Sequence, residues 1–367
     1  MSDRLVYSPE ELLESHPLEE PLVVGGERYH GGFDASGQYV SPRTFNRAPA
    51  IKAWQEKLRS ETDMPLIDCP PDMFAENYPN IEQTKYLLSE GIREPVTHML
   101  THIGTVEGFG AVIRAVVIPD MTSLFVEPVD GTAMVHLPGL YEAHARDEAG
   151  FEDEGGHQQM WYGVRDIAFE SPDVGDPLNL IMKMMKPGSA GGKAMSGMAG
   201  SIMAPSRIVP EIDADLEAMI TRMTGLLLIE LLAAQTFKWG EAVVGDDRYC
   251  SDAATAARLV DYIRADEAPH VEYLKTVLTE MRSRTFIATD GRRLPGTEII
   301  DRCWEYSMRQ MFGLGGKRSE RRAMIADQLD TALAGNRRKK AILANFYDLE
   351  TPDPTVDEES ELVVAGR

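Results

Sequence analysis

The chain has 367 residues, of which 43% are hydrophobic and 26% are charged, and its formal net charge is −22. A chain of this length can bury about three-quarters of the surface that it exposes when unfolded, which allows a large core. The negative charge repels phosphate groups and therefore excludes general binding to nucleic acids or acidic membrane surfaces.

The cysteine content and the apolar segments indicate a cytoplasmic protein. The three cysteines form no pairing pattern, which excludes a disulfide framework and a zinc ribbon. The N-terminal segment MSDRLVYSPEELLE has no signal-peptide core. The most apolar run, residues 223–237, is shorter than about 20 residues and contains Glu230, so it predicts a buried helix instead of a membrane span.

The first 92 residues predict an extension made of loops and short helices. Ser8 and Pro9 are typical of a helix start. The stretch that follows, to about residue 45, is rich in Gly and Pro and predicts loops. Short helices are expected near 47–60 and 80–91.

Longer helices dominate the rest of the chain. Residues 93–285 predict a four-helix bundle, because four helical stretches follow one another there, each with its own stop signals. The stretches are 94–118, 140–170, 213–244 and 252–284. C-terminal helices are expected within 286–350, at 296–313 and 318–346. The predicted fold class is all-α.

Two segments have compositions of their own. The insert at 180–207 is dense in Met, Gly, Ala and Ser, which is typical of a flexible loop or of a soft apolar flap over a substrate. The tail at 351–367 is acidic and is expected to be disordered. Basic runs at 317–322 and 337–340 indicate solvated helix faces or a docking patch for an acidic partner.

Glu-x-x-His occurs three times, and two of the copies lie on predicted long helices. The copies are Glu27–His30, Glu154–His157 and Glu267–His270. The first lies among glycine-rich loops and is interpreted as chance. In the other two, positions three apart lie about 60° from each other on a helix, so the acid and the imidazole can reach one metal ion. An acid, Asp153 or Asp266, precedes each of these two pairs.

The two remaining long helices each contain one glutamate in apolar surroundings. Glu107 lies in GTVEGFGAVI and Glu230 in TGLLLIELLAAQTF. A buried and unpaired glutamate is costly, and a metal ion would compensate its charge. The glycines near Glu107 favour either a substrate cavity or close helix packing.

This chain order of one carboxylate, one pair, one carboxylate and one pair resembles the ferritin-like di-iron carboxylate superfamily, over residues 94–285. Members of that superfamily hold two metals in a bundle core with four Glu and two His. They include acyl-carrier desaturases, rubrerythrin-like proteins, bacterial multicomponent monooxygenases and arylamine N-oxygenases. The resemblance implies that each Glu/His pair holds one metal and that Glu107 and Glu230 complete the site and take part in catalysis.

More than one ligand assignment is open for the first pair and for the third helix. Gly155 and Gly156 cost a helix about 2 kcal/mol relative to alanine, so other first pairs that use Glu148, Glu152 or His144 are open. His144 with Glu148 is the main alternative to the pair Glu154 and His157. Glu241 could replace Glu230. Pro269 should bend or widen its helix and thereby set how Glu267 and His270 meet a metal.

Such a ligand set suits Fe(II) or Mn(II), and the expected cofactor is two iron ions, with Mn/Fe as a variant. Two such metals could bind and reduce O₂. We therefore expect a di-iron oxygenase or oxidase acting on a small or acyl-type substrate, with an electron-donor protein as a candidate partner and a homodimer as the assembly. The alternatives are a ferritin-like protein for metal storage or peroxide detoxification and a helical scaffold whose metal site has decayed. Trp161 and Tyr273 are expected to line or support the site, or to relay electrons.

Overall fold

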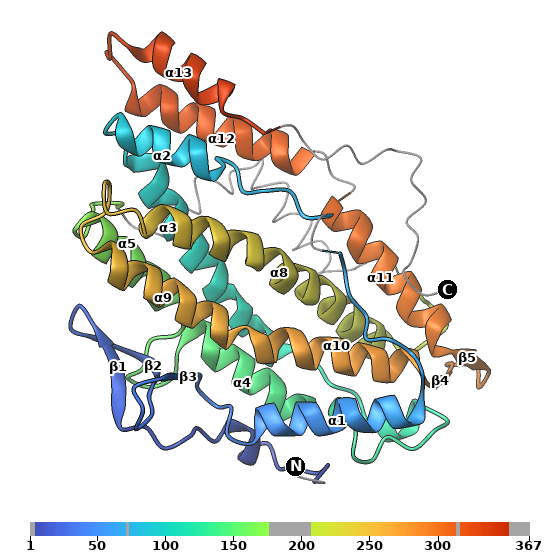
Figure 1. The fold of residues 1–367 in the computed structure, drawn as a ribbon. Coiled ribbons are helices and arrows are strands. Elements are labelled where there is room, and N and C mark those ends of the chain that lie inside the picture. The colour runs from blue at the N-terminus through green and yellow to red at the C-terminus, as the bar shows by residue number, and fades with distance from the viewer. Residues whose placement is uncertain (1–3, 71–72, 176–206, 313–315, 352–367) are drawn as a thin grey trace.

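The computed structural model describes residues 4–70, 73–175, 207–312 and 316–351, and within them the protein is mostly helical with two small sheets (Figure 1). The prediction of an all-α fold is correct for most of the described chain, but it misses these sheets. The predictions for the insert at 180–207 and for the acidic tail lie almost entirely outside the described residues.

The N-terminal elements are η1 (Glu11–Leu13), β1 (Glu20–Val24), β2 (Glu27–Phe33), β3 (Tyr39–Val40), α1 (Arg47–Glu61) and α2 (Ile81–Ser89). The strands and α1 lie below the long helices in Figure 1, whereas α2 lies above them beside α13. The three strands form an antiparallel sheet in the order β1-β2-β3 where only loops were expected. The glycines in β2 obscured the strand pattern, and one of them is required there, because a Cβ at Gly32 would lie 2.4 Å from the carbonyl oxygen of Glu20 in β1.

The central elements are mostly long helices. They are α3 (Glu94–Gly108), η3 (Phe109–Ala115), η4 (Met121–Ser123), η5 (Ala133–His136), α4 (Leu137–Ala149), α5 (His157–Phe169), α8 (Ala214–Val244), α9 (Ala253–Asp266) and α10 (Ala268–Arg282). α5 packs against α3 and α9, and α8 packs against α9 and α10. This packing, around buried His and Glu groups, is compatible with a ferritin-like fold.

The single helix expected over 140–170 is wrong, because the chain breaks between α4 and α5. Gly150 ends α4 with φ of 83°, a backbone conformation that favours glycine. A Cβ at Gly156 would lie 2.3 Å from the amide nitrogen of Gly150, so this turn is too tight for a side chain at that position. The turn places the start of α5 directly beside the end of α4.

The helix expected over 252–284 is divided at Glu267, as its proline predicted. α9 ends at Asp266, and Pro269 lies in the first turn of α10. Since proline has no N–H, it cannot donate to the carbonyl of Ala265. The amide of His270 bonds to the carbonyl of Glu267 at 3.0 Å, which is a tighter turn than an α-helix makes. The predicted distortion at this position is therefore confirmed, but as a tightened turn and not as a widened one.

The C-terminal elements are β4 (Thr285–Ile287), β5 (Arg293–Pro295), α11 (Gly296–Phe312), α12 (Gly316–Ala332) and α13 (Lys339–Asp348). β4 and β5 pair as a short antiparallel hairpin, and α11 matches the helix expected at 296–313. The single helix expected at 318–346 is wrong. It is two helices joined by a turn in which Gly335 has φ of 76°.

The buried apolar side chains form two large clusters, and the long helices pass through both. One cluster takes the first part of α8 together with α4, α10 and α11. The other takes the last part of α8 together with α3, α5 and α9. Between them, in the segments around Glu230 of α8 and Glu267 after α9, the buried side chains are acidic and imidazole groups.

Candidate metal centre

Seven acidic and imidazole side chains converge between the two apolar clusters. They are Glu107 of α3, His144 and Glu148 of α4, His157 of α5, Glu230 of α8, Glu267 between α9 and α10, and His270 of α10. They form two groups, in each of which one ligand atom from every residue lies within 4.8 Å of the others. One group is His144, Glu148, Glu230 and His270; the other is Glu107, Glu148, His157 and Glu267. Either group could hold a metal ion.

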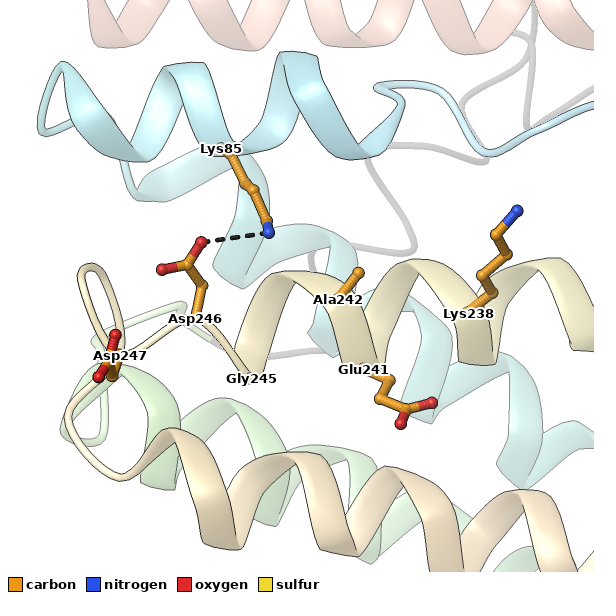
Figure 2. A pocket seen from close by; sticks show the side chains of 7 residues that line it. All are labelled: Lys85, Lys238, Glu241, Ala242, Gly245, Asp246 and Asp247. Atoms are coloured by element: carbon orange, nitrogen blue, oxygen red, sulfur yellow. Dashed lines mark ion pairs between the residues drawn. The ribbon is translucent and has the colours of Figure 1, made fainter.

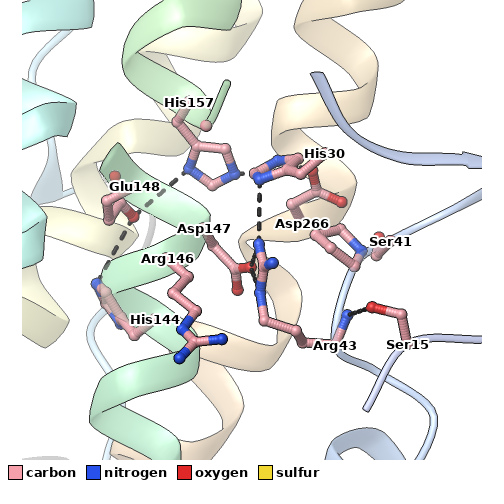
Figure 3. Close-up of polar contacts among 12 residues, drawn as sticks. Ser15, His30, Ser41, Arg43, His144, Arg146, Asp147, Glu148, His157 and Asp266 are labelled. Carbon is pink, nitrogen blue, oxygen red and sulfur yellow. Dashed lines mark hydrogen bonds and ion pairs between the residues drawn. The ribbon is translucent and has the colours of Figure 1, made fainter. Parts of the chain in front are cut away.

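Glu148 and Glu267 lie between the two groups. Glu148 Oε1 is 3.6 Å from His144 Nε2, 3.5 Å from His157 Nδ1 and 3.4 Å from His270 Nδ1. The carboxylate of Glu267 places Oε1 3.0 Å from His157 Nδ1 and Oε2 2.7 Å from His270 Nδ1. Both carboxylates therefore lie near histidines of both groups and could take part in holding an ion in either one (Figure 3 shows Glu148 with His144 and His157).

Several buried atoms in the two groups have no hydrogen-bond partner among the described residues. Apart from His157 Nε2, which lies 3.7 Å from Asp266, they are His144 Nε2, Glu148 Oε2, His157 Nδ1 and Glu267 Oε1. The last two lie 3.0 Å apart, but without the geometry of a hydrogen bond. Buried polar atoms are normally hydrogen-bonded, and an unpartnered one needs a physical reason. All four are good ligand atoms for a cation, and they belong to side chains that converge on one place. The residues present therefore fit a metal centre.

The electrostatics of the group also favour bound cations. Burial raises the pKa of Glu107 well above its usual range, and the nearby carboxylates of Glu148 and Glu267 raise it further. Burial likewise raises the pKa of Glu230, and Glu267 adds to this effect. Burial lowers the pKa of His144 to about 3, which keeps its imidazole neutral. Metal ions would stabilise ionised carboxylates beside neutral imidazoles.

Two buried aspartates contact the histidines from behind. Asp147 Oδ2 lies 2.9 Å from His270 Nε2, and Asp266 Oδ2 lies 3.7 Å from His157 Nε2. Burial by itself lowers the pKa of His270, but Glu267 and then Asp147 raise it well above its usual value. A carboxylate behind an imidazole orients the ring and makes its opposite nitrogen a stronger metal ligand.

Asp147 and Asp266 form an outer layer behind the candidate ligands, and residues of the N-terminal region complete it. Arg43 lies 2.5 Å from Asp147, and Arg47, the first residue of α1, lies 2.8 Å from it. Six carboxylates belong to the two layers: Glu107, Asp147, Glu148, Glu230, Asp266 and Glu267. The two arginines offset two of the six negative charges, so four remain. Two divalent cations would balance them.

His30 of β2 belongs to this outer layer, and Figure 3 shows it between Arg43 and Asp266. Its Nδ1 lies 3.2 Å from Arg43 Nη2, and arginine can only donate, so Nδ1 accepts. His30 Nε2 therefore carries the proton and donates to Asp266 at 3.0 Å. His30, His157 and Asp266 form a third group with metal-ligand geometry. However, both ring nitrogens of His30 are used in these two contacts, so it has no lone pair left for a metal. Its role is to orient Asp266.

The structure brings five of the six sequence-predicted ligands together: Glu107, His157, Glu230, Glu267 and His270. It does not bring Glu154 to them. Glu154 lies in the turn between α4 and α5, its side chain is 30% exposed, and its carboxylate pairs with Arg28 at 2.7 Å. The pair of His144 and Glu148 lies in the cluster instead.

Glu152 and Glu241, which the sequence also allows as ligands, lie outside the cluster. Glu152 is exposed in the same turn as Glu154. Glu241 is exposed in a surface pocket near the end of α8, where Lys85 pairs with Asp246 (Figure 2). Neither glutamate can therefore replace a ligand of the buried centre.

The sequence pattern gives no local signal for the part that His30 plays. Its Glu-x-x-His copy lies among glycines and is interpreted as chance, yet the side chain of the histidine is fully buried against Asp266. Glu27, the acid of the same copy, is exposed and therefore does not belong to the buried outer layer. The spacing of the copy is thus unrelated to the reason why His30 is buried.

Trp161 and Tyr273 are fully buried, and each contacts one candidate ligand. Trp161 Nε1 donates to Glu107 Oε1 at 3.2 Å, and Tyr273 Oη lies 3.2 Å from His144 Nδ1. Of the two interpretations of the glycines near Glu107, the structure favours close packing. A Cβ at Gly110 would lie 2.5 Å from Cγ of Glu148, and one at Gly104 would lie 2.9 Å from Tyr162.

No protein-family model, curated protein or solved structure matches this chain. Within the described residues, every helix is too short or too polar to cross a membrane.

Proposed function

We propose that this protein is an O₂-dependent oxidoreductase, an oxygenase or oxidase, with a carboxylate-bridged di-iron centre in a ferritin-like helical bundle. The observation that carries the proposal is the position of Glu148 and Glu267, each within ion-pair distance of histidines from both ligand groups. A single metal ion would need only one of these groups. Carboxylates that are shared between the groups suit a centre with two metals.

The ligand types support iron as the metal. Carboxylate oxygens together with imidazole nitrogens, and no thiolate, suit Fe(II) or Mn(II) better than structural zinc. The charge balance of the two layers supports two divalent ions. Two irons are the proposed content, and one manganese with one iron is the variant that the same ligands would accept.

When bound, two Fe(II) ions would supply the electrons with which O₂ is reduced. The protein's own residues would bind and orient these ions. Glu148 and Glu267 would hold both ions, and Glu230 and Glu107 would each hold one. Asp147 and Asp266 would fix the rings of His270 and His157, and the apolar clusters on either side would limit the entry of water. A small or acyl-type organic molecule is the proposed substrate class.

The glycines beside Glu107 support a second candidate function, metal storage or peroxide detoxification without an organic substrate. Because Gly104, Gly108 and Gly110 are occupied by close packing, they provide no substrate space themselves. An oxygenase or oxidase would release an oxidised organic product. A storage protein would accumulate iron beyond the two ions of the centre.

Anaerobic loading with Fe(II), followed by elemental analysis and exposure to O₂, tests the proposal. We expect two irons per chain, an absorption change on exposure to O₂, and loss of one iron in Glu267→Ala and in His270→Ala. Iron well above two per chain would favour storage. Protein without bound iron, or full occupancy in both variants, would refute the di-iron centre.

A further inference from the structure

Resting on the proposed di-iron function, we propose that the two metal positions are unequal. The position beside Glu230 binds its ion more tightly, and the position beside Glu107 is the one that accepts small external ligands. Each position adds different residues to the shared pair, Glu148 and Glu267.

The two positions differ in their number of imidazoles. Beyond the shared carboxylates, the position beside Glu230 has two histidines, His144 and His270. The position beside Glu107 has one, His157. A third glutamate completes each set. Because Glu267 also contacts His270 at 2.7 Å and lies beside Glu230, the Glu230 position offers five protein ligands and the Glu107 position offers four. An ion with more protein ligands is held more tightly and keeps fewer coordination positions for solvent.

The additional imidazole, that of His144, is held in a fixed orientation. Its ring stacks on that of His270, with 3.9 Å between the centroids and 17° between the planes. The hydroxyl of Tyr273 lies 3.2 Å from its Nδ1. This contact leaves Nε2 facing Glu230 Oε1 at 3.4 Å and Glu148 Oε1 at 3.6 Å. The ligand atom therefore needs no rearrangement to reach a metal.

The Glu107 position is also nearer to solvent. Glu230 is 8% exposed, whereas Glu107 is more exposed and is followed at once by the end of α3. Its neighbours Val106 and Phe109 are 43% and 45% exposed. A small anion or O₂ can therefore approach the side that also has the fewer ligands. The smaller number of protein ligands and the easier access from solvent both favour the Glu107 position as the one that accepts small external ligands.

Calorimetric titration of the metal-free protein with Co(II) tests the inequality without relying on activity. We expect two binding steps with dissociation constants that differ by roughly 10-fold or more. His144→Ala should weaken the tighter step by roughly 10- to 100-fold, and the matched variant His157→Ala should remove the weaker step only. Circular dichroism verifies that each variant is folded. If one of them is not, the titration of the unmodified protein still decides between one and two classes of site.

Azide, followed by the visible spectrum of the bound Co(II), tests which position is open. We expect azide to change the spectrum of the form with two Co(II) ions and to leave the form with one ion unchanged. Two equal constants, or an azide response in the one-ion form, would overturn the inference while leaving the dimetal centre intact. No binding of Co(II) at all would overturn both the inference and the proposed centre.

Discussion

Asp147 Oδ2 lies 2.9 Å from His270 Nε2, and this contact joins α4 to α10 directly behind the candidate metal centre. Each of the two buried aspartates precedes a shared glutamate in the sequence and contacts the histidine associated with the other one. Asp147 precedes Glu148 and contacts His270, and Asp266 precedes Glu267 and contacts His157. Each Asp-Glu dipeptide therefore supplies a candidate ligand and a support for another candidate ligand.

Asp266→Asn should weaken metal binding at the His157 position by roughly 10- to 100-fold, because the amide no longer provides a carboxylate behind the imidazole. Asp266 is a better choice than Asp147, whose loss would also leave Arg43 and Arg47 unpaired. Metal titration monitored by calorimetry measures the effect. Asp153→Asn, an exposed acid that precedes Glu154, is the control and should bind metal normally. Equal binding by both variants would contradict the support role of Asp266.

Glu148→Gln should abolish tight binding of at least one ion, whereas Glu154→Gln should keep two ions per chain. Both substitutions remove one carboxylate with little change of shape. Glu148 lies 3.4 to 3.6 Å from three imidazoles, while Glu154 pairs with Arg28 near the surface. Elemental analysis after loading with Fe(II) gives the stoichiometry. Loss of iron in the Glu154 variant alone would restore the assignment made from the Glu-x-x-His pattern.

The sequence predicted α8 and the place of Glu230 in the buried cluster well, because a long apolar run with a glutamate inside has few interpretations. It placed Glu154 in the cluster, where the structure has Glu148, because both lie close to His157 in the chain. Only the turn made by Gly150 and Gly156 decides which one lies beside the imidazole. That turn depends on close backbone approach, to which side-chain spacing gives no clue. His30 was missed because its burial depends on a sheet formed far from the cluster in sequence.

Pro269→Ala should stabilise the metal-free protein and weaken its metal binding. An alanine at this position restores an amide that can bond to the carbonyl of Ala265, so α9 and α10 can join into one helix. We expect the free energy of unfolding to rise by about 1 kcal/mol, less than for a proline inside an unbroken helix, because Pro269 lies in the first turn of α10. Metal affinity should fall by roughly 10-fold, since Glu267 and His270 would be displaced.

Urea unfolding and metal titration of the same samples test this pair of opposite changes. Pro138→Ala is the matched control, because Pro138 also lies in the first turn of a helix, α4, but is exposed. The control should leave metal affinity unchanged. Unchanged affinity in Pro269→Ala would mean that the helix break does not set the geometry of the ligands.

Glu280 gives the folded protein a pH dependence that is independent of the metal centre. Its carboxylate accepts the amides of Ala133 and Met134 at 2.9 and 3.0 Å, and burial raises its pKa from 4.5 to about 7. Between these two values the folded chain keeps a proton that the unfolded chain releases. Stability from this group is therefore fully present below pH 4.5 and is lost as the pH rises to about 7, by about 3 kcal/mol in all.

Glu280→Gln cannot titrate, so its free energy of unfolding should fall less than that of the unmodified protein between about pH 5 and about pH 7.5. Urea unfolding of both metal-free proteins at the two pH values measures the difference, and the titration of all remaining groups cancels in the comparison. Glu298→Gln makes the same charge change at an exposed position of α11 and should keep the pH dependence of the unmodified protein. If Glu280→Gln also kept it, the carboxylate would have to be ionised in the folded protein across this range, held by the two amides alone.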